Sequence, residues 1–316
     1  MKEIKDDFII FDDVTFVYGD YHDDSQEAPE AHSDGDLGGS VDNESADFSS
    51  YTDRPKEALK NVSFTIRQGE FVCIVGSNGS GKSTCAKLMN GLLVPSSGIV
   101  TSAGYNTADE KNIWEIRRLV GMVFQNPDNQ IISTSVEEDV AFGLENIGVP
   151  RDEMIKRVDE ALMLCGVEKL RKSEPHLLSG GQKQRVSIAG ILAMRPSCIV
   201  LDESTAMLDP KGCKSVLDTV KKLNTEENIT VVLITHHMNE IVDADKVIVM
   251  DKGTVAKVGT PKEIFSDKKL LNDLNLELPP AASVFEAVSG FDFGDIILSP
   301  EQGTSVLLEK FKRSNA

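Results

Sequence analysis

The chain has 316 residues, of which 40% are hydrophobic, and its formal net charge at pH 7 is −18. This apolar content is enough to bury a substantial core in one large or two smaller domains. The acidic balance argues against nucleic-acid binding, which normally leaves a basic surface. The longest apolar runs fall far below the ~20 residues needed to cross a bilayer, and we find no basic, apolar leader at the N-terminus. We therefore expect a chain that folds alone.

The cysteines are scattered along the sequence, and none of them has C-x-x-C spacing. Cys73 and Cys198 fall in predicted buried strands, which is typical of reduced core thiols in a cytosol. A metal or disulfide role is the alternative, and the spacing does not favour it. The five positions are Cys73, Cys85, Cys165, Cys198 and Cys213.

An acidic segment, residues 19–56, separates two predicted strands at residues 8–18 and 59–66. It contains 11 acidic and 2 basic residues, a net charge of −9 and half of the total. With so few apolar residues it cannot bury enough surface to offset the entropy of ordering the chain. We predict a disordered loop inserted between two strands, with a divalent-cation site or a partner motif as the alternatives.

A glycine-rich stretch, residues 76–84, directly follows the apolar run at residues 71–75. It fits the phosphate-loop pattern G-x-x-x-x-G-K-[ST]. Its glycines let backbone N–H groups turn inward toward an anion at the start of the next helix, predicted at residues 86–93 with Leu88, Met89 and Leu92 on one face. Lys82 would reach the β- and γ-phosphates and Ser83 would ligate Mg²⁺. The predicted phosphate-binding residues are Gly76, Ser77, Asn78, Gly79, Ser80, Gly81, Lys82, Ser83 and Thr84.

The middle of the chain contains a block of predicted helices without strand signals. It starts with a capping box formed by Ser135 and Glu138, and it lasts until Cys198. Elsewhere the patterns predict strands at residues 99–101, 120–124, 246–250 and 254–258, and helices at 109–119 and 152–165.

Three further stretches contain residues suited to binding or catalysis. Residues 179–182, Ser-Gly-Gly-Gln, open a predicted helix with exposed N–H groups, which makes a second possible anion site. The apolar strand at residues 198–201 leads into Asp202 and Glu203, and the next apolar strand leads into His236. Ligands bind at the carboxyl ends of strands in open parallel sheets, so we expect these three side chains at one sheet edge.

Together the motifs resemble those of ATP-binding cassette (ABC) ATPases over residues 8–260. In chain order they are a phosphate loop at residues 76–84, a Q-loop glutamine (Gln125), a signature sequence (Ser179, Gly180, Gly181 and Gln182), a Walker B strand at residues 198–202 followed by Glu203, a D-loop at residues 204–209 and a switch histidine (His236).

The resemblance implies an α/β P-loop NTPase of the ABC ATPase fold. It would have a RecA-like core, an antiparallel β subdomain begun by residues 1–18, and an inserted helical signature subdomain at about 132–190. The ATPase domain would cover residues 57–260, and residues 261–316 would form a short C-terminal helical extension. The acidic insertion at residues 19–56 departs from the family pattern.

The resemblance also implies a role for each motif in ATP hydrolysis. Glu203 would be the catalytic base that positions water, and His236 the switch at the γ-phosphate, since phosphoryl transfer depends on positioning and charge compensation. Tyr18 would stack on adenine, and an ordinary strand-end tyrosine is the alternative. The implied Mg²⁺ ligands are Ser83, Gln125 and Asp202. Besides the phosphate loop, the implied ATP-binding residues are Tyr18, Gln125, Ser179, Gly180, Gly181, Gln182 and Asp209.

Within the ABC family, residues 124–130, 138–143 and 204–210 resemble the ATPase subunits of energy-coupling factor (ECF) transporters. These transporters have two paralogous ATPases, and the resemblance is strongest to the first, the A1 type. Those subunits energise uptake of vitamins and transition-metal ions. The resemblance implies a peripheral protein on the cytoplasmic face of the cell membrane. Its partners would be a transmembrane energy-coupling subunit and a substrate-binding membrane subunit, and it would bind no nucleic acid.

The signature glycines have no phosphate-binding lysine of their own, so the family's head-to-tail arrangement implies that hydrolysis needs a second ATPase subunit. We expect a paralogue ahead of a second copy. The C-terminal residues 299–302 form a predicted capping box, and Val306, Leu307 and Phe311 give that helix an apolar stripe, suited to a subunit contact or to docking on its own domain.

Two other functions remain open at this point. One is a soluble ABC ATPase that acts as a nucleotide-gated module outside transport. The other is a catalytically silent partner, which intact Glu203 and His236 disfavour. The transported substrate is not identified by the sequence, because in ECF systems a separate membrane protein selects it.

Overall fold

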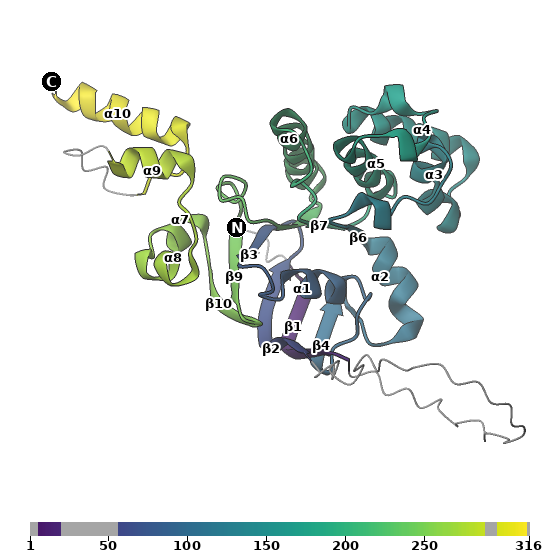
Figure 1. Cartoon of the computed structure of the whole chain (residues 1–316), viewed down its shortest axis with the longest axis horizontal. Coiled ribbons are helices and arrows are strands. Elements are labelled where there is room, and N and C mark those ends of the chain that lie inside the picture. Colours follow the sequence, from purple (N-terminus) through teal and green to yellow (C-terminus); the bar gives the residue numbers. More distant parts are fainter. Residues whose placement is uncertain (1–5, 20–55, 288–295, 315–316) are drawn as a thin grey trace, which may run out of the picture.

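The computed structural model of the chain describes residues 6–19, 56–287 and 296–314, the last five of these by their backbone alone. Two sheets and the helices around them make up this part of the chain (Figure 1). The disorder predicted for the acidic segment concerns residues that lie, apart from Gly19 and Lys56, outside the described residues.

The first sheet is antiparallel and has the strand order β2-β1-β4-β5. Its strands are β1 (Asp7–Tyr18), β2 (Lys56–Arg67), β4 (Ser97–Ser102) and β5 (Tyr105–Asn106). Alternating apolar residues of β2, Val62, Phe64 and Ile66, are buried as their spacing predicts. Tyr18 and Lys56 are paired across β1 and β2. The acidic segment therefore connects two adjacent strand ends, in agreement with an insertion into a hairpin.

The second sheet has the order β10-β9-β3-β8-β7-β6, with only the β9–β10 pair antiparallel. Its strands are β3 (Phe71–Gly76), β6 (Val120–Val123), β7 (Cys198–Asp202), β8 (Thr230–Ile234), β9 (Lys246–Asp251) and β10 (Thr254–Gly259). Every residue of β3, β7 and β8 is buried, as expected for parallel strands covered on both faces. Asp202 pairs with Ile234, so the ends of β7 and β8 lie side by side.

Helices α1 (Lys82–Met89), α2 (Ile113–Leu119) and α6 (Pro210–Glu227) connect the strands. The predicted helix at residues 86–93 was misplaced, because α1 begins at Lys82 and ends at Met89. Gly91 has a φ of 66° and Leu92 N–H donates back to Lys87 O at 2.8 Å, which is the pattern of a glycine-terminated helix. Leu92 consequently lies beyond the helix and is 38% exposed.

The helical block contains α3 (Val136–Asn146), α4 (Arg151–Leu164) and α5 (Gly180–Ala193), which pack against one another beside the sheets (Figure 1). The Ser135 hydroxyl accepts from Glu138 N at 3.4 Å, and the Glu138 carboxylate accepts from the Thr134 hydroxyl at 2.7 Å. Short 3-10 turns complete the connections: η2 (Glu110–Asn112), η3 (Pro127–Asn129), η4 (Glu168–Leu170) and η5 (Pro175–Leu177).

The C-terminal region has four helices, α7 (Pro261–Phe265), α8 (Lys268–Leu274), α9 (Pro280–Ala287) and α10 (Pro300–Ser314). Ser299 Oγ accepts from Gln302 N at 3.2 Å, which confirms the predicted N-cap, while Gln302 Oε1 accepts from Leu298 N at 3.0 Å. Helix α10 packs against α9, and Figure 1 shows the two helices projecting away from the sheets. Across the described residues, we find no helix with the length and apolar character of a membrane span.

Candidate nucleotide-binding and hydrolysis site

The loop between β3 and α1 has a backbone that only glycine can adopt at two positions. Gly76 has a φ of 148°, and a Cβ there would lie 2.2 Å from Met250 O. Gly81 has a φ of 103°, and a Cβ there would lie 2.6 Å from Leu59 Cδ2. Glycine at these two positions lets the loop pass close to β9 and β2 and lead directly into α1. A phosphate-binding loop requires such a path, because the N–H groups at the start of the helix can then bind an anion.

Lys82, the first residue of α1, turns back over this loop. Its Nζ donates to Gly76 O at 2.9 Å and to Ser77 O at 3.0 Å, and it lies 3.8 Å from Glu203 Oε1. Burial lowers the pKa of Lys82, and the carboxylates of Glu203 and Asp202 oppose that shift. An ammonium group has three donors, so one remains for an anion in the loop.

Ser83 and Asp202 meet at the carboxyl edge of the parallel sheet. Ser83 Oγ donates to Asp202 Oδ1 at 2.9 Å, and Asp202 is buried. Burial raises the pKa of Asp202, while the hydrogen bond from Ser83 opposes the shift. A hydroxyl and a carboxylate oxygen in contact are a donor set that suits Mg²⁺.

Glu203 contacts three other predicted site residues. Gln125 Nε2 donates to Glu203 Oε2 at 2.9 Å, and His236 Nδ1 lies 4.0 Å from the same oxygen. Lys82 Nζ approaches the other carboxylate oxygen at 3.8 Å. Glu203 has a φ of 47°, and its N–H donates to Ile234 O at 3.0 Å, so the neighbouring strand holds it in a backbone conformation that is rare outside glycine.

A cavity of about 400 Å³ is lined by Lys82, Ser83, Gln125 and Glu203, whereas Asp202 and His236 contact these residues without forming part of its wall. Tyr18 forms part of its wall, with its hydroxyl 3.2 Å from Thr84 Oγ1 and its ring edge-to-face with Phe16. Sequence reasoning missed Lys56, whose place on the wall follows from its pairing with Tyr18. The lining residues are Tyr18, Lys56, Ala58, Asn78, Gly79, Gly81, Lys82, Ser83, Thr84, Gln125 and Glu203.

The signature residues lie apart from this cavity, at the start of α5 in the helical block. Ser179 Oγ accepts from Gln182 N at 3.3 Å and Gln182 Oε1 accepts from Ser179 N at 2.9 Å, a complete capping box with Gly180 as the first helical residue. Asp209 also lies outside the cavity wall, where its carboxylate caps α6 by accepting from Gly212 N at 3.2 Å. The structure thus places the phosphate loop with Gln125, Asp202, Glu203 and His236, and it leaves the signature residues and Asp209 elsewhere.

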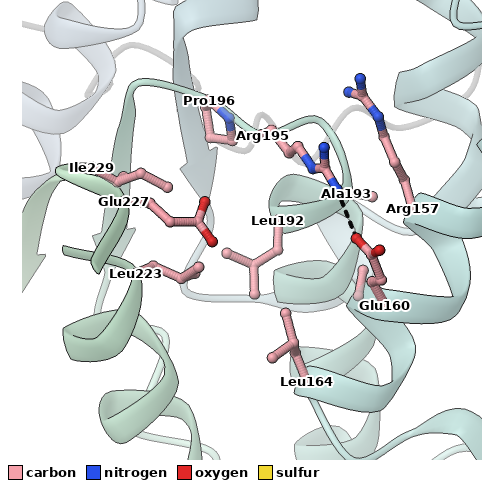
Figure 2. A pocket seen from close by; sticks show the side chains of 11 residues that line it. Arg157, Glu160, Leu164, Leu192, Ala193, Arg195, Pro196, Leu223, Glu227 and Ile229 are labelled. Carbon is pink, nitrogen blue, oxygen red and sulfur yellow. Dashed lines mark hydrogen bonds and ion pairs between the residues drawn. The ribbon is translucent and has the colours of Figure 1, made fainter. Parts of the chain in front are cut away.

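A second cavity, of about 330 Å³, lies between α4, the end of α5 and the end of α6 (Figure 2). Leu192, Leu223 and Ile229 give it an apolar side, and Arg195 pairs at 2.7 Å with Glu160, which also lines it. It contains none of the predicted site residues, so it is distinct from the nucleotide cavity.

Comparisons with known proteins identify the family of the chain. The sequence profile of the ABC transporter family matches residues 59–206. The chain is 52% identical over 256 residues to the energy-coupling factor transporter ATP-binding protein EcfA1 of Clostridium novyi, covering 80% of this chain and 91% of that protein. It is 54% identical over 233 residues to the EcfA1 protein of Clostridioides difficile, covering 73% and 84%.

Solved structures give the same result. The structure of cbiO1 from Clostridium perfringens, part of the ABC transporter complex cbiONQ, matches with a TM-score of 0.66 and 35% identity, covering 89% of this chain and 100% of that chain. The ATP-binding cassette MJ0796, a dimer in a post-hydrolysis state bound to ADP and Pi, matches with a TM-score of 0.66 and 31% identity, covering 80% and 99%. With half of its aligned residues identical over nine-tenths of such a relative, the chain belongs to the family of energy-coupling factor transporter ATP-binding proteins of the EcfA1 type.

Proposed function

We propose that the chain is the ATP-hydrolysing subunit of an ECF-type importer, in which a head-to-tail pair of ATPase subunits drives uptake of a vitamin or a transition-metal ion. The family to which it belongs consists of ABC ATPases that hydrolyse ATP in transport. The observation that carries the proposal is that Glu203, on the cavity wall, contacts Lys82 and Gln125 of the same wall and lies 4.0 Å from His236.

The phosphate loop and Lys82 would bind the phosphates of ATP. N–H groups of the loop between Gly76 and Gly81 would bind the phosphate oxygens, and the third donor of Lys82 would supply positive charge. Ser83, Asp202 and the side-chain oxygen of Gln125 would hold Mg²⁺, and this group of hard oxygen donors fits that ion. Mg²⁺, when bound, would neutralise charge on the phosphate oxygens.

Glu203 would act on the attacking water. Its carboxylate is largely buried, and Gln125 and His236 flank one of its oxygens, so the group is held in one orientation. A base in a fixed place supplies what phosphoryl transfer to water requires, which is a positioned nucleophile. His236 would contact the γ-phosphate, and the ring of Tyr18 on the cavity wall would stack on adenine.

The second half of the site would come from a partner ATPase subunit. Ser179 and Gly180 are exposed and Gly181 is half-buried at the start of α5, and none of the three lines the cavity that contains Lys82 of the same chain. The Ser179 N–H already donates to Gln182 Oε1, so the N–H groups of Gly180 and Gly181 would form the anion site, and a head-to-tail pair would place them on the γ-phosphate held by the partner. This arrangement makes hydrolysis dependent on two subunits, and we expect the other to be a paralogue.

An apolar groove of about 300 Å³ between α2, α3 and α5 would receive the transmembrane energy-coupling subunit. Trp114 is 73% exposed there, Ile132 64% and Phe142 43%, which is unusual exposure for large apolar side chains. Phe124 lines the groove and is followed directly by Gln125 of the nucleotide cavity. A partner in the groove would therefore contact the chain beside the site of hydrolysis, at the cytoplasmic face of the membrane.

Replacing Phe142 with Glu tests this assignment. A charge in the apolar groove should remove the membrane proteins that co-purify with the chain, while ATP binding persists because the nucleotide cavity is untouched. Met163→Glu is the matched control, since Met163 is 72% exposed and lies outside the groove. If no multi-span membrane protein co-purifies with the unaltered chain, the alternative of a soluble nucleotide-gated ATPase is favoured instead.

A further inference from the structure

A buried carboxylate outside the nucleotide cavity connects the two segments that carry Glu203 and His236. Glu240 is 3% exposed, and its Oε2 accepts from the Thr205 hydroxyl at 3.2 Å. Its Oε1 accepts from the Cys213 thiol at 3.3 Å. A carboxylate is costly to bury, so one that is retained with so few partners calls for a reason.

Each end of this connection leads to the hydrolysis site. Glu240 N–H donates to His237 O at 3.0 Å, which closes a turn directly after His236. Thr205 is 4% exposed and belongs to the turn that begins at Glu203, because Ala206 N–H donates to Glu203 O at 3.2 Å. The bond between Thr205 and Glu240 thus joins the loop after β7 to the loop after β8.

The bond from Cys213 attaches the Glu240 carboxylate to a third segment, helix α6. Cys213 is in the first turns of α6, where the helix dipole favours a negative charge. Glu240 is therefore attached at three points: to the histidine segment by its backbone, to the Glu203 turn by one oxygen, and to α6 by the other. Such a group sets where the two loops lie relative to each other.

We propose that Glu240 is a positioning residue for ATP hydrolysis, which holds the Glu203 loop against the His236 loop through Thr205. The proposal rests on the roles assigned to Glu203 and His236 under the proposed function. Glu203 Oε2 and His236 Nδ1 are 4.0 Å apart, and this distance depends on how the two loops lie. Among the described contacts, the bond from Glu203 N–H to Ile234 O is the one backbone hydrogen bond that connects the Glu203 loop to β8 and the loop after it.

Steady-state ATPase kinetics of the full chain, purified with the subunits that co-purify, test the proposal. Glu240→Met removes both acceptors at similar volume, and Thr205→Val removes the hydroxyl at the same shape. Each should lower kcat by up to about a hundredfold, the loss that a misplacement of about 1 Å causes, with KM for ATP unchanged because the phosphate loop is intact. The double variant should be no slower than the slower single variant, since both break one bond.

The conservative variants and a control separate positioning from folding. Thr205→Ser keeps the hydroxyl that donates to residue 240, and Glu240→Gln keeps an oxygen that accepts from residue 205. Both variants should therefore retain kcat close to that of the unaltered chain. Glu70→Met is the matched control: Glu70 is a partly buried carboxylate that bonds Lys246 at 2.7 Å at the opposite end of β3, so its loss should leave kcat unchanged.

Three results would overturn the inference. Unchanged kcat in Thr205→Val is the first, and an equal loss in Glu70→Met is the second. The third is turnover by Glu203→Gln at the rate of the unaltered chain, which would remove the base assignment and the inference with it. If Glu203→Gln is inactive while Glu240→Met and Thr205→Val are fully active, the proposed function stands and only the role of Glu240 fails.

Discussion

Glu203 is the residue on which most contacts in the nucleotide cavity converge. Gln125, Lys82 and His236 all lie within 4.0 Å of its carboxylate oxygens. Two tasks are divided between these residues. Lys82 hydrogen-bonds the backbone of the phosphate loop and would serve ATP binding, whereas Glu203 would serve hydrolysis. Binding and hydrolysis should consequently respond to different substitutions.

The Glu203→Gln variant should bind ATP but hydrolyse it about 10²- to 10⁴-fold more slowly, the range over which a positioned base acts. Gln has the same shape and cannot accept a proton, so the phosphate contacts remain while the water loses its base. With ATP the variant should accumulate as a nucleotide-bound dimer on size-exclusion chromatography. Turnover at the rate of the unaltered chain would contradict the base assignment.

At the scale of elements, the β1–β2 hairpin shows how a long acidic segment can be inserted without separating its strands. Tyr18 and Lys56 are directly paired, and the ladder continues from them to the other end of both strands. Ile9, Val14 and Val62 of this ladder are fully buried. A short turn between Tyr18 and Lys56 would therefore be enough to keep β1 and β2 paired.

Replacing residues 20–55 with Asn-Gly, which leaves the turn Gly19-Asn-Gly, should not lower ATPase activity or the thermal midpoint. A shorter loop costs less closure entropy, about 0.6 kcal/mol for each halving of length, and three-residue turns suit hairpins. Thermal unfolding and ATPase assays measure both quantities. A large fall in the midpoint would mean that the segment packs on the domain, and loss of membrane-complex assembly alone would indicate a partner site.

The contact between α9 and α10 is close enough to depend on one glycine. A Cβ at Gly303 would lie 1.9 Å from Phe285 Cζ, so any larger residue must displace the ring. Gly303→Val should detach α10 from α9, and if the C-terminal extension mediates pairing of the ATPase subunits it should also weaken that pairing. Hydrogen exchange at residues 300–309 and sedimentation analysis measure the two effects. Ser305→Val, at an exposed position of the same helix, should change neither.

At the scale of the whole molecule, the phosphate loop and the signature sequence lie on different parts of the chain. Lys82 follows β3 at the sheet edge, and Ser179 begins α5 in the helical block, beside the sheets in Figure 1. A single chain thus has two incomplete anion sites. Under the proposed function, this division would make a pair of chains the active unit.

Complementation tests this directly if the chain pairs with itself. Lys82→Ala removes the main positive charge on the phosphates, and Ser179→Arg blocks the signature N–H groups, so each variant should be inactive alone. Mixed in equal amounts, they should recover part of the activity, because one composite site in each mixed pair is intact. An isolated monomer with full activity would contradict the whole arrangement.

The sequence by itself determined the parts of this protein that consecutive residues create. The apolar runs before Gly76 and Asp202 became buried parallel strands, and the glycine pattern became the loop before α1. The N-caps predicted at Ser135 and Ser299 also formed. These features are local, because the strand period, the helix cap and the phosphate loop each depend on residues a few positions apart.

Only the tertiary structure decided the features that join distant segments. The positive φ of Glu203 accompanies its hydrogen bond to Ile234 on the next strand. The place of Lys56 in the cavity and the bond between Thr205 and Glu240 depend on strand pairing and on loops more than 30 residues apart. Such contacts have no local pattern, since their geometry is set by how the strands and helices pack together.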